Sequence, residues 1–365
     1  MTAARCILVC AGGTGGHLFP AQALAVALGA RGFPVELATD DRALKYGADF
    51  PARAIHAIPS ATPTGAGLVS KFGAALVLTR GVALAYARLR AIAPRVVIGF
   101  GGYPTVPPLL AASLLGLPTL LHEQNAVMGR ANRFLAGRVR LVATGFPELK
   151  GAPAAVLAKA RYTGNPVRPA VLAAARLPYP DFADGRLRVL VTGGSQGARV
   201  MADVAPAALA LLAPAERARL VWTQQARGED QARVAAACAA LGFPAEIAEF
   251  FPDLPARIAA AHLTIGRAGA STVSELAVIG RPSILVPFPH ALDQDQAANA
   301  AVLAAEGAAQ VIRQPDFTPE RLAEILRGAL ADPAALTLAA QAAKAAGVAD
   351  AADRLAALVA EIAGG

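Results

Sequence analysis

Two glycine-rich segments of this chain have the composition of phosphate-binding turns. One is Gly12–His17, with the sequence GGTGGH, and the other is Gly193–Arg199, with the sequence GGSQGAR. Each follows a short apolar run and precedes an alanine-rich stretch with helical periodicity, so each is predicted to join a strand to a helix. Glycine lets the backbone approach an anion closely, and a helix N-terminus offers N–H groups and a positive dipole end. The sequence therefore predicts two phosphate cradles.

A third segment combines the same turn chemistry with side chains suited to a nucleoside diphosphate sugar. Residues Gly266–Leu276 (GRAGASTVSEL) follow an apolar run and open a helix, which places N–H groups and hydroxyls at a helix N-terminus. Pyrophosphate would bind these N–H groups, and the carboxylate of Glu275 would accept hydrogen bonds from a ribose diol. Further along, the amides of Gln296 and Asn299 offer donors and acceptors for sugar hydroxyls.

Two common nucleotide motifs do not fit these turns. Reading the dinucleotide fingerprint G-x-G-x-x-G from Gly13 puts Leu18 at the last glycine, although Asp40 occupies the place of a ribose-binding acid. Neither turn is followed by the Lys-Ser or Lys-Thr pair of a P-loop. Hydride transfer and nucleoside triphosphate hydrolysis are therefore disfavoured.

Alternating apolar strands and longer helices fill both halves of the chain. Strands are expected at residues 7–10, 35–38, 96–98, 119–121 and 141–143, and in the second half at 188–191, 220–222, 263–265, 283–286 and 309–312. Strands that alternate with helices predict an α/β fold of two doubly wound units. Prolines between Asn165 and Asp184 interrupt regular structure and place the join of the units there.

Composition indicates an ordered protein in a reducing compartment. A length of 365 residues with 55% hydrophobic and 5% aromatic content suits about two domains, each with its own core. The three cysteines form neither a disulfide framework nor a metal-ligand spacing, which favours the cytoplasm. The N-terminus is expected to be a first strand and not a signal peptide. The glycines and prolines of Val96–His122 exclude a spanning helix there, and we expect no segment that crosses a membrane.

Charge is unevenly distributed along the chain. The formal net charge is +8, and no acidic residue occurs between Asp49 and Glu123. This stretch interleaves Lys71, Arg80 and Arg88 with apolar residues, so it could lie on an anionic membrane surface. An ordinary amphipathic helix with a solvated basic face is the simpler interpretation of this signal alone. Aromatic residues are not interleaved as in nucleic-acid-binding surfaces, so we expect no nucleic-acid partner.

The order and spacing of seven motifs make the chain resemble the MurG family, which is part of glycosyltransferase family 28. The motifs are GGTGGHLFPA at 12–21, GGYPTVPP at 101–108, HEQNAVMGRANR at 122–133, TGNPVR at 163–168, GGSQGAR at 193–199, GRAGASTVSEL at 266–276 and DQDQAANA at 293–300. The resemblance implies a GT-B fold, with two Rossmann-like domains facing across a cleft. Residues 1–163 would form the acceptor and membrane side and residues 164–340 the donor side, and a C-terminal helix at 341–365 would pack back on the N-terminal domain.

The same resemblance implies a hexosyltransferase of peptidoglycan synthesis. Such an enzyme transfers N-acetylglucosamine (GlcNAc), with inversion, from UDP-GlcNAc to the 4-hydroxyl of N-acetylmuramic acid (MurNAc) in undecaprenyl-pyrophosphoryl-MurNAc-pentapeptide, converting lipid I into lipid II. The expected partners are UDP-GlcNAc, lipid I, the anionic surface of the inner membrane, and proteins of cell-wall synthesis and division. The expected location is the cytoplasmic face of the plasma membrane, bound peripherally.

The resemblance also assigns substrate-binding roles by position. Ser195 would bind the donor diphosphate, Glu275 the ribose diol, and the backbone near Phe251 the uracil. Gln296 and Asn299 would belong to the GlcNAc hydroxyl site. The start of one helix would bind phosphate and ribose through Ala270, Ser271, Thr272, Val273 and Ser274. The residues that would reach the donor from the other domain are Thr14, Gly15, Gly16, Asn125 and Arg168.

An inverting displacement requires a base that takes the proton of the acceptor hydroxyl. His17, at the end of the first glycine segment, is our candidate, although a histidine in this place is often a structural hydrogen-bonding group. His122 and Glu123 are rivals, and Glu123 is better suited to anchoring its loop.

An acidic pair raises the question of a metal ion. Asp293 and Asp295 match the short acidic metal motif of the other large glycosyltransferase fold, but such pairs recur by chance. Asp295 also stands directly before Gln296, where an amide or a histidine is expected in some relatives. We expect no metal and no cofactor, because helix N-termini and Arg199 or Arg267 can supply the positive charge.

Two alternatives remain open at this point. The chain could be another GT-B enzyme that uses a UDP-sugar, such as a glycolipid synthase or a UDP-GlcNAc 2-epimerase, although the GGTGGH and HEQN motifs argue against both. It could also be a catalytically silent scaffold that binds the lipid acceptor, although its motifs are intact.

Overall fold

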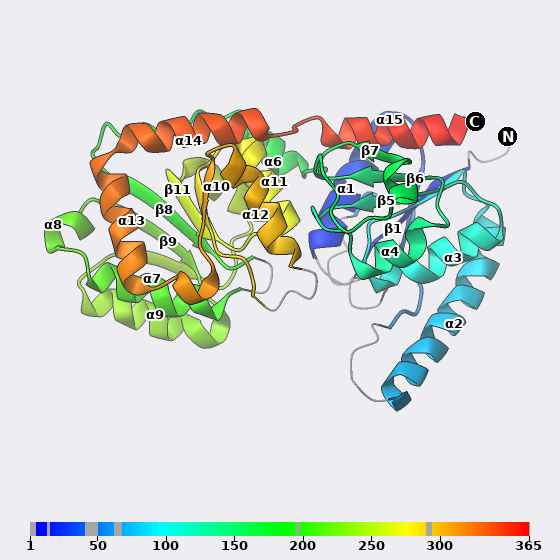
Figure 1. Cartoon of the computed structure of the whole chain (residues 1–365), viewed down its shortest axis with the longest axis horizontal. Coiled ribbons are helices and arrows are strands. Elements are labelled where there is room, and N and C mark those ends of the chain that lie inside the picture. The colour runs from blue at the N-terminus through cyan, green and yellow to red at the C-terminus, as the bar shows by residue number, and fades with distance from the viewer. Residues whose placement is uncertain are drawn as a thin grey trace. The chain divides into compact units, whose positions relative to one another are not determined.

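The chain divides into two compact units, which we call unit 1 and unit 2 (Figure 1). The structure, a computed structural model, describes residues 5–12, 15–40, 50–61, 68–194, 197–289 and 294–364, with the backbone alone at 68–71. Unit 1 comprises Met1–Arg168 and Ala349–Gly365, and unit 2 comprises Pro169–Val348. The chain thus leaves unit 1 at Arg168, within the proline-bearing segment where the join is expected, and returns to it at Ala349.

In the described part of unit 1, seven parallel strands form one sheet in the order β3-β2-β1-β4-β5-β6-β7. The central strands are continuous apolar runs whose residues are all buried, as parallel strands covered on both faces require. The strands are β1 (Ile7–Cys10), β2 (Val35–Thr39), β3 (Ala54–Ala57), β4 (Val96–Gly99), β5 (Thr119–Glu123), β6 (Leu141–Thr144) and β7 (Ala160–Tyr162).

Helices cover both faces of this sheet. On one face, Leu24 of α1 and Val359 of α15 join the core formed with β1 and β4, and on the other face Leu89 of α2 and Leu109 of α3 do so. Figure 1 shows α15 lying beside α1 within unit 1. The helices are α1 (Gly15–Ala30), α2 (Leu68–Ile92), η2 (Tyr103–Thr105), α3 (Val106–Leu114), α4 (Arg130–Ala136), α5 (Ala154–Leu157) and α15 (Ala351–Gly364).

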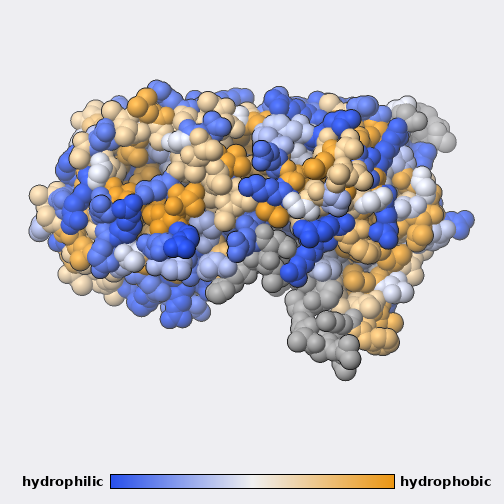
Figure 2. Space-filling model, viewed as in Figure 1, coloured by the Kyte–Doolittle hydropathy of each residue, from blue (hydrophilic) through white to orange (hydrophobic). Residues whose placement is uncertain are grey.

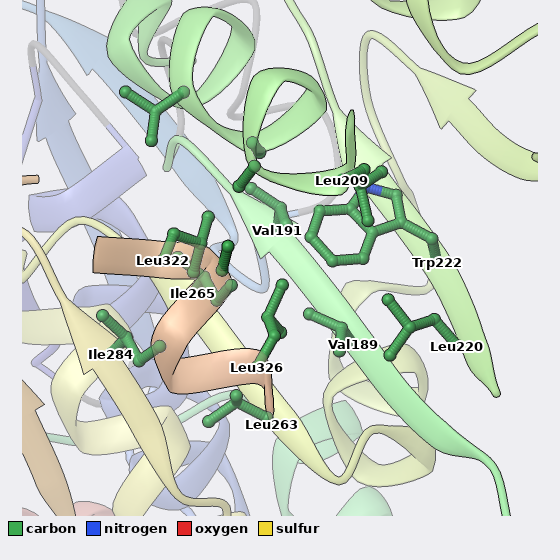
Figure 3. Close-up of a cluster of buried hydrophobic side chains, with 14 of the residues drawn as sticks. Val189, Val191, Leu209, Leu220, Trp222, Leu263, Ile265, Ile284, Leu322 and Leu326 are labelled. Carbon is green, nitrogen blue, oxygen red and sulfur yellow. The ribbon is translucent and has the colours of Figure 1, made fainter. Parts of the chain in front are cut away.

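In the described part of unit 2, six parallel strands form a second sheet in the order β10-β9-β8-β11-β12-β13. Figure 3 shows Val189 and Val191 of β8 packed among Trp222, Ile265 and Leu326 in its core. The strands are β8 (Leu187–Thr192), β9 (Leu220–Gln225), β10 (Ala245–Ala248), β11 (Leu263–Gly266), β12 (Ser283–Leu285) and β13 (Ala309–Val311). The helices are α6 (Pro169–Ala174), α7 (Arg199–Ala210), α8 (Pro214–Arg217), α9 (Gly228–Ala240), α10 (Leu254–Ala260), α11 (Ala270–Ile279), α12 (Asp295–Ala305), η3 (Gln314–Asp316), α13 (Pro319–Ala331) and α14 (Pro333–Ala346).

The predicted α/β fold of two doubly wound units is confirmed, and every predicted strand is present. The structure adds three strands that the sequence patterns did not reveal, β3, β7 and β10. Each lies at an edge of its sheet, where one side faces no neighbouring strand. Their residues are half-buried or exposed, so they lack the continuous apolar run by which the buried strands were predicted.

The expected C-terminal helix at 341–365 needs correction, because this region contains the end of one helix and the whole of another. Helix α14 runs to Ala346 and packs on α11 in unit 2, whereas α15 begins at Ala351 and packs on α1 in unit 1. The break falls at Gly347, whose backbone is extended with φ −75° and ψ 133°. A Cβ atom at Gly347 would lie 2.6 Å from the carbonyl oxygen of Ala277, so only glycine fits where the chain leaves α14.

Helix α2 also corrects the expectation that no segment could cross a membrane. Among the described residues, Phe72–Ile92 is long and apolar enough to do so by length and composition, with a mean hydropathy of 1.3. Its arginines interrupt the apolar run, but only Arg80 and Arg88 are charged between Phe72 and Leu89. A narrow stripe of α2 is buried, at Gly81, Ala85 and Leu89, and much of the rest is exposed.

Candidate active-site residues in the two units

The predicted site residues of unit 1 lie at the carboxyl ends of its parallel strands, where α/β sheets bind ligands. Thr14 is outside the described residues, and Gly15 and Gly16 form the start of α1 directly after it. Gly12 ends the β1 side of this turn, and a Cβ atom there would lie 2.8 Å from Oδ1 of Asp40. The same Cβ atom would lie 3.0 Å from Oγ1 of Thr39, so Gly12 packs closely against the end of β2.

His17 occupies the first turn of α1 and is partly exposed. Its Nδ1 lies 3.1 Å from Oε1 of Gln124, which follows β5. The other edge of the ring faces Gly102, where a Cβ atom would lie 3.3 Å from Nε2. Gly102 has a φ of 72°, a conformation that favours glycine. Because glycine has no side chain, there is space beside the imidazole.

His122, the rival candidate for the base, is fully buried at the end of β5. Its Nε2 lies 3.1 Å from the carbonyl oxygen of Gly164, and its Nδ1 lies 3.1 Å from Nε2 of Gln124. Burial lowers the pKa of His122 to about 4, because the imidazolium would lose its hydration. A fully buried, neutral imidazole with both nitrogens hydrogen-bonded is poorly placed to take a proton from a substrate.

Glu123 anchors the loop that follows β5. Its carboxylate accepts hydrogen bonds from the backbone N–H groups of Asn125 and Gly129, both at 3.0 Å, and from Nδ2 of Asn132 at 2.8 Å. The side chain is buried, and this burial raises its pKa despite the donors around it. Glu123 thus fixes the backbone of Asn125, one of the predicted donor contacts.

Arg168, where the chain leaves unit 1, lies against the first turns of α1. Its guanidinium carbon is 4.1 Å from the centre of the Phe19 ring, a cation–π contact. Phe19 also packs against Gly15, where a Cβ atom would lie 3.0 Å from its ring. The structure therefore gathers His17, Asn125 and Arg168 around the start of α1 and the loop after β5.

In unit 2, the predicted diphosphate turn follows β8. Ser195 is outside the described residues, and Gly194 and Gly197 on either side have φ values of 78° and 65°, in the left-handed region. Gln225, at the end of β9, holds the turn, because its Oε1 accepts from Oγ1 of Thr192 at 2.8 Å and from the backbone N–H of Gly193 at 3.1 Å. Gln225 was not predictable from the sequence, since its neighbours along the chain form no recognisable motif.

The third glycine segment forms the start of α11, with Gly269 as the N-cap residue. Ala270 and Val273 are buried, so they can offer a ligand only backbone groups, whereas Ser271, Thr272 and Ser274 are partly exposed. Glu275 lies one turn into α11 and is 7% exposed. This arrangement matches the predicted combination of helix N–H groups, hydroxyls and one carboxylate.

The predicted sugar-binding amides support the loop before α11. Oε1 of Gln296 accepts from the backbone N–H groups of Ala268 at 3.3 Å and Phe288 at 3.0 Å. Nδ2 of Asn299 donates to the carbonyl oxygen of Ala268 at 3.2 Å, and the Asn299 side chain is fully buried. Both amides thus position the backbone of this loop, and their roles in sugar binding stay predictions.

Two further predictions concern the rim of unit 2. Phe251 is buried beneath Arg257, whose guanidinium carbon is 4.2 Å from the ring centre, so only its backbone is suited to reading a base. Arg267 donates to the carbonyl oxygens of Val286 at 3.0 Å and Pro287 at 3.2 Å, which ties β11 to the end of β12.

Asp293, one residue of the acidic pair considered as a metal site, is outside the described residues. Among the residues that are described, no three His, Cys, Asp or Glu side chains are grouped to hold a metal ion.

Comparison with known proteins assigns both units to one class of enzyme. The glycosyltransferase family 28 N-terminal domain matches residues 7–144, and the family 28 C-terminal domain matches residues 188–355. The UDP-N-acetylglucosamine–N-acetylmuramyl-(pentapeptide) pyrophosphoryl-undecaprenol N-acetylglucosamine transferase of Methylobacterium radiotolerans is 58% identical over 359 residues. That match covers 98% of this chain and 97% of the relative.

Solved structures show the same relationship. The crystal structure of Acinetobacter baumannii MurG is 29% identical, with a TM-score of 0.79 and coverage of 98% of this chain and 99% of the other. A structure described as a UDP-N-acetylglucosamine 2-epimerase from Listeria monocytogenes has a TM-score of 0.67 over 98% and 96% of the two chains, but only 14% identity. The latter shows a shared fold alone.

Proposed function

This chain belongs to glycosyltransferase family 28, and from that premise we propose that it transfers GlcNAc from UDP-GlcNAc to the 4-hydroxyl of MurNAc in undecaprenyl-pyrophosphoryl-MurNAc-pentapeptide. The reaction inverts the anomeric carbon and converts lipid I into lipid II in peptidoglycan synthesis. The observation that carries the proposal is the 58% identity, across nearly the whole of both chains, with a relative named for this transfer. The same premise argues against a catalytically silent scaffold, because the motif residues in both units are intact.

His17 is the base in this proposal. It would take the proton of the acceptor 4-hydroxyl as that oxygen attacks the anomeric carbon from the face opposite UDP. The support is geometric, because His17 is partly exposed at the start of α1, whereas His122 and Glu123 are buried and fully used in holding the loop after β5. The bond between the anomeric carbon and UDP breaks with its electron pair going to the diphosphate.

Unit 2 holds the donor in this proposal. The glycine turn after β8, with Ser195, and the start of α11 would bind the diphosphate through backbone N–H groups, and the positive ends of α7 and α11 would stabilise the departing UDP. Glu275 would accept hydrogen bonds from the ribose diol, and backbone near Phe251 would read the uracil. No step of this mechanism routes a proton through a residue of unit 2.

The lipid substrate places the protein at a membrane, and α2 supports a peripheral contact. Phe72 and Leu76 are 73% and 64% exposed, and Arg80 and Arg88 are exposed on the same helix. In Figure 2 the free end of α2 is mostly coloured as hydrophobic. Exposed apolar side chains with cations beside them suit the interface of an anionic bilayer, so α2 would lie on the cytoplasmic surface of the plasma membrane and bring unit 1 to its lipid-linked acceptor.

The experiment that tests the function uses the full chain, radiolabelled UDP-GlcNAc and a lipid I analogue with a short lipid. We expect a labelled disaccharide product that forms only when both substrates are present. Conversion of UDP-GlcNAc alone into another UDP-sugar would instead indicate an epimerase, and label transfer to a different lipid acceptor would indicate another sugar transferase. A folded protein that binds the lipid I analogue but never transfers label would instead indicate a catalytically silent scaffold.

A further inference from the structure

A chain of hydrogen bonds links His17 to the backbone through two buried side chains of unit 1. Nδ1 of His17 meets Oε1 of Gln124 at 3.1 Å, and Nε2 of Gln124 meets both Nδ1 of His122 at 3.1 Å and the carbonyl oxygen of His122 at 2.9 Å. The chain ends where Nε2 of His122 meets the carbonyl oxygen of Gly164 at 3.1 Å. His122 and Gln124 are 0% and 2% exposed, so water does not compete for the bonds that these two residues make with each other and with Gly164.

Two backbone carbonyls fix the direction of every bond in this chain. A carbonyl oxygen can only accept, so Nε2 of His122 must carry a hydrogen for Gly164. Burial keeps His122 neutral at ordinary pH by lowering its pKa to about 4, which leaves Nδ1 of His122 as an acceptor. The group of Gln124 that faces both this Nδ1 and the carbonyl oxygen of His122 must then be the amide NH₂, with one hydrogen for each acceptor.

The same logic extends to His17. Because the NH₂ group of Gln124 is committed to His122, its carbonyl oxygen is the atom that faces Nδ1 of His17. An amide oxygen only accepts, so Nδ1 of His17 must donate. A neutral imidazole carries one hydrogen, and with that hydrogen on Nδ1 the lone pair lies on Nε2, the atom beside Gly102.

We propose that Gln124 is a positioning residue that holds neutral His17 as the Nδ1–H tautomer. Nε2 of His17 is then the atom that takes the proton of the acceptor hydroxyl. His122 in turn orients Gln124. This inference rests on the proposed role of His17 as the base. During transfer the O–H bond of the acceptor breaks and an Nε2–H bond forms, while Nδ1 keeps its hydrogen. The bond from Nδ1 to Gln124 then becomes charge-assisted, and an amide that cannot be deprotonated never draws the proton away.

The tautomer itself can be observed without any substrate. The full chain is labelled with ¹⁵N-histidine, two-bond ¹H–¹⁵N spectra are recorded near pH 7.5, and the His17 signals are identified by their loss in His17→Gln. We expect a protonated Nδ1 and an unprotonated Nε2 at His17. The opposite tautomer in the parent protein would overturn the proposal, whatever its enzymatic activity.

Gln124→Met removes both hydrogen-bonding groups and keeps the length of the side chain. We expect the Nε2–H tautomer of His17 to gain population and kcat to fall about tenfold or more, with the dissociation constant for UDP-GlcNAc within twofold of the parent. Gln224→Met is the matched control, because Gln224 is also buried, accepts from Nε1 of Trp222 and donates to the carbonyl oxygen of Met201, but lies in unit 2. It should leave the His17 spectrum unchanged.

The outcomes separate this inference from the proposed function. A Gln124→Met protein that keeps the Nδ1–H tautomer, or keeps kcat within twofold of the parent, overturns the positioning role. If this variant does not fold, the tautomer of the parent protein decides by itself. A parent protein that fails to transfer GlcNAc but shows Nδ1–H at His17 overturns the proposed function alone and supports the direction of the hydrogen bonds.

Discussion

Side-chain hydrogen bonds hold both the loop after β5 in unit 1 and the loop before α11 in unit 2, but the two sets of side chains differ. In unit 1 the bonds come from two histidines, a glutamine and a glutamate, and the chain of bonds ends at Gly164. In unit 2 they come from Arg267, Gln296 and Asn299, which keep one protonation state between pH 5 and 9.

This difference matches the two tasks of a sugar transfer. In our proposal the loop in unit 1 surrounds His17, which gains a proton during each turnover, so its hydrogen bonds have to specify where protons lie. In the same proposal the loop in unit 2 presents backbone N–H groups to a diphosphate whose charge hardly changes on binding, so fixed donors are sufficient. We therefore expect changes in unit 1 to affect kcat and its pH dependence, and changes in unit 2 to affect donor affinity with little pH dependence.

The largest expected effect is that of His17→Ala. Loss of the base should lower kcat by about 10²–10⁴-fold, the usual contribution of a positioned proton acceptor. Donor affinity should stay near that of the parent, because the diphosphate is bound by unit 2 in our proposal. Steady-state kinetics with the lipid I analogue and calorimetry with UDP measure the two quantities. A kcat within a few-fold of the parent would move the role of the base to another residue.

A pH-dependent loss of stability should come from His122. Its folded pKa, about 4, lies below the ordinary value of 6.5, so below pH 6.5 the unfolded chain binds a proton that the folded chain does not. The free energy of unfolding should therefore be fully retained above pH 6.5 and fall by about 1.4 kcal/mol per pH unit down to pH 4, or about 3 kcal/mol in all. Urea unfolding followed by circular dichroism at several pH values measures this slope.

His122→Gln is the comparison that isolates this contribution. The variant should be less stable at every pH. Between pH 6.5 and 4, however, its free energy of unfolding should fall less steeply than that of the parent, by about 1.4 kcal/mol per pH unit. Only the difference in slope is informative, because the pKa values of Glu36 and Glu123 are also shifted by folding and contribute to the pH dependence of stability. Equal slopes would mean that folding does not lower the pKa of His122.

The sequence predicts the fold of this protein better than it predicts the arrangement of the site. Buried parallel strands were predictable because both of their faces are covered, which makes them short continuous apolar runs such as β1 and β4. The edge strands β3, β7 and β10 were not, because half of their surface faces solvent and their composition resembles that of loops. The break at Gly347 was not predictable either, since it depends on the approach of Ala277 from a distant helix.

In the site, the sequence pointed to residues whose chemistry is distinctive but not to the residues that orient them. His17 and Glu275 attract attention because an imidazole or a carboxylate beside a glycine turn is unusual. Gln124 and Gln225 were passed over, although the first lies inside the motif HEQN, because the role of an amide depends on which donors and acceptors it meets in space. The order of hydrogen bonds from Gly164 to His17 spans three separate segments and has no signature along the chain.

A smaller effect is expected from Glu275→Ala in unit 2. If Glu275 accepts hydrogen bonds from the ribose diol, its loss should weaken UDP-GlcNAc binding by about 1–3 kcal/mol, the usual magnitude for a charge-assisted pair. Glu306→Ala removes the same charge from an exposed position of unit 2 and is the matched control. Calorimetry that shows unchanged UDP affinity in folded Glu275→Ala would reject the assignment.

The smallest effect per residue is expected at the surface of α2. Each basic residue near an anionic bilayer contributes about 1 kcal/mol before screening, so replacing Lys71, Arg80 and Arg88 together with Glu should release the protein from anionic liposomes. Added salt should produce the same release in the parent, because screening shortens the reach of surface charge. Turnover of a soluble, short-chain acceptor should stay largely intact, since the contact supplies location and not chemistry. The matched control makes the same charge change at three exposed arginines of unit 2, Arg176, Arg186 and Arg313. If the α2 variant sediments with anionic vesicles as well as the parent and this control do, then the basic residues of α2 are a solvated face, and the exposed Phe72 and Leu76 or another surface must hold the protein at the membrane.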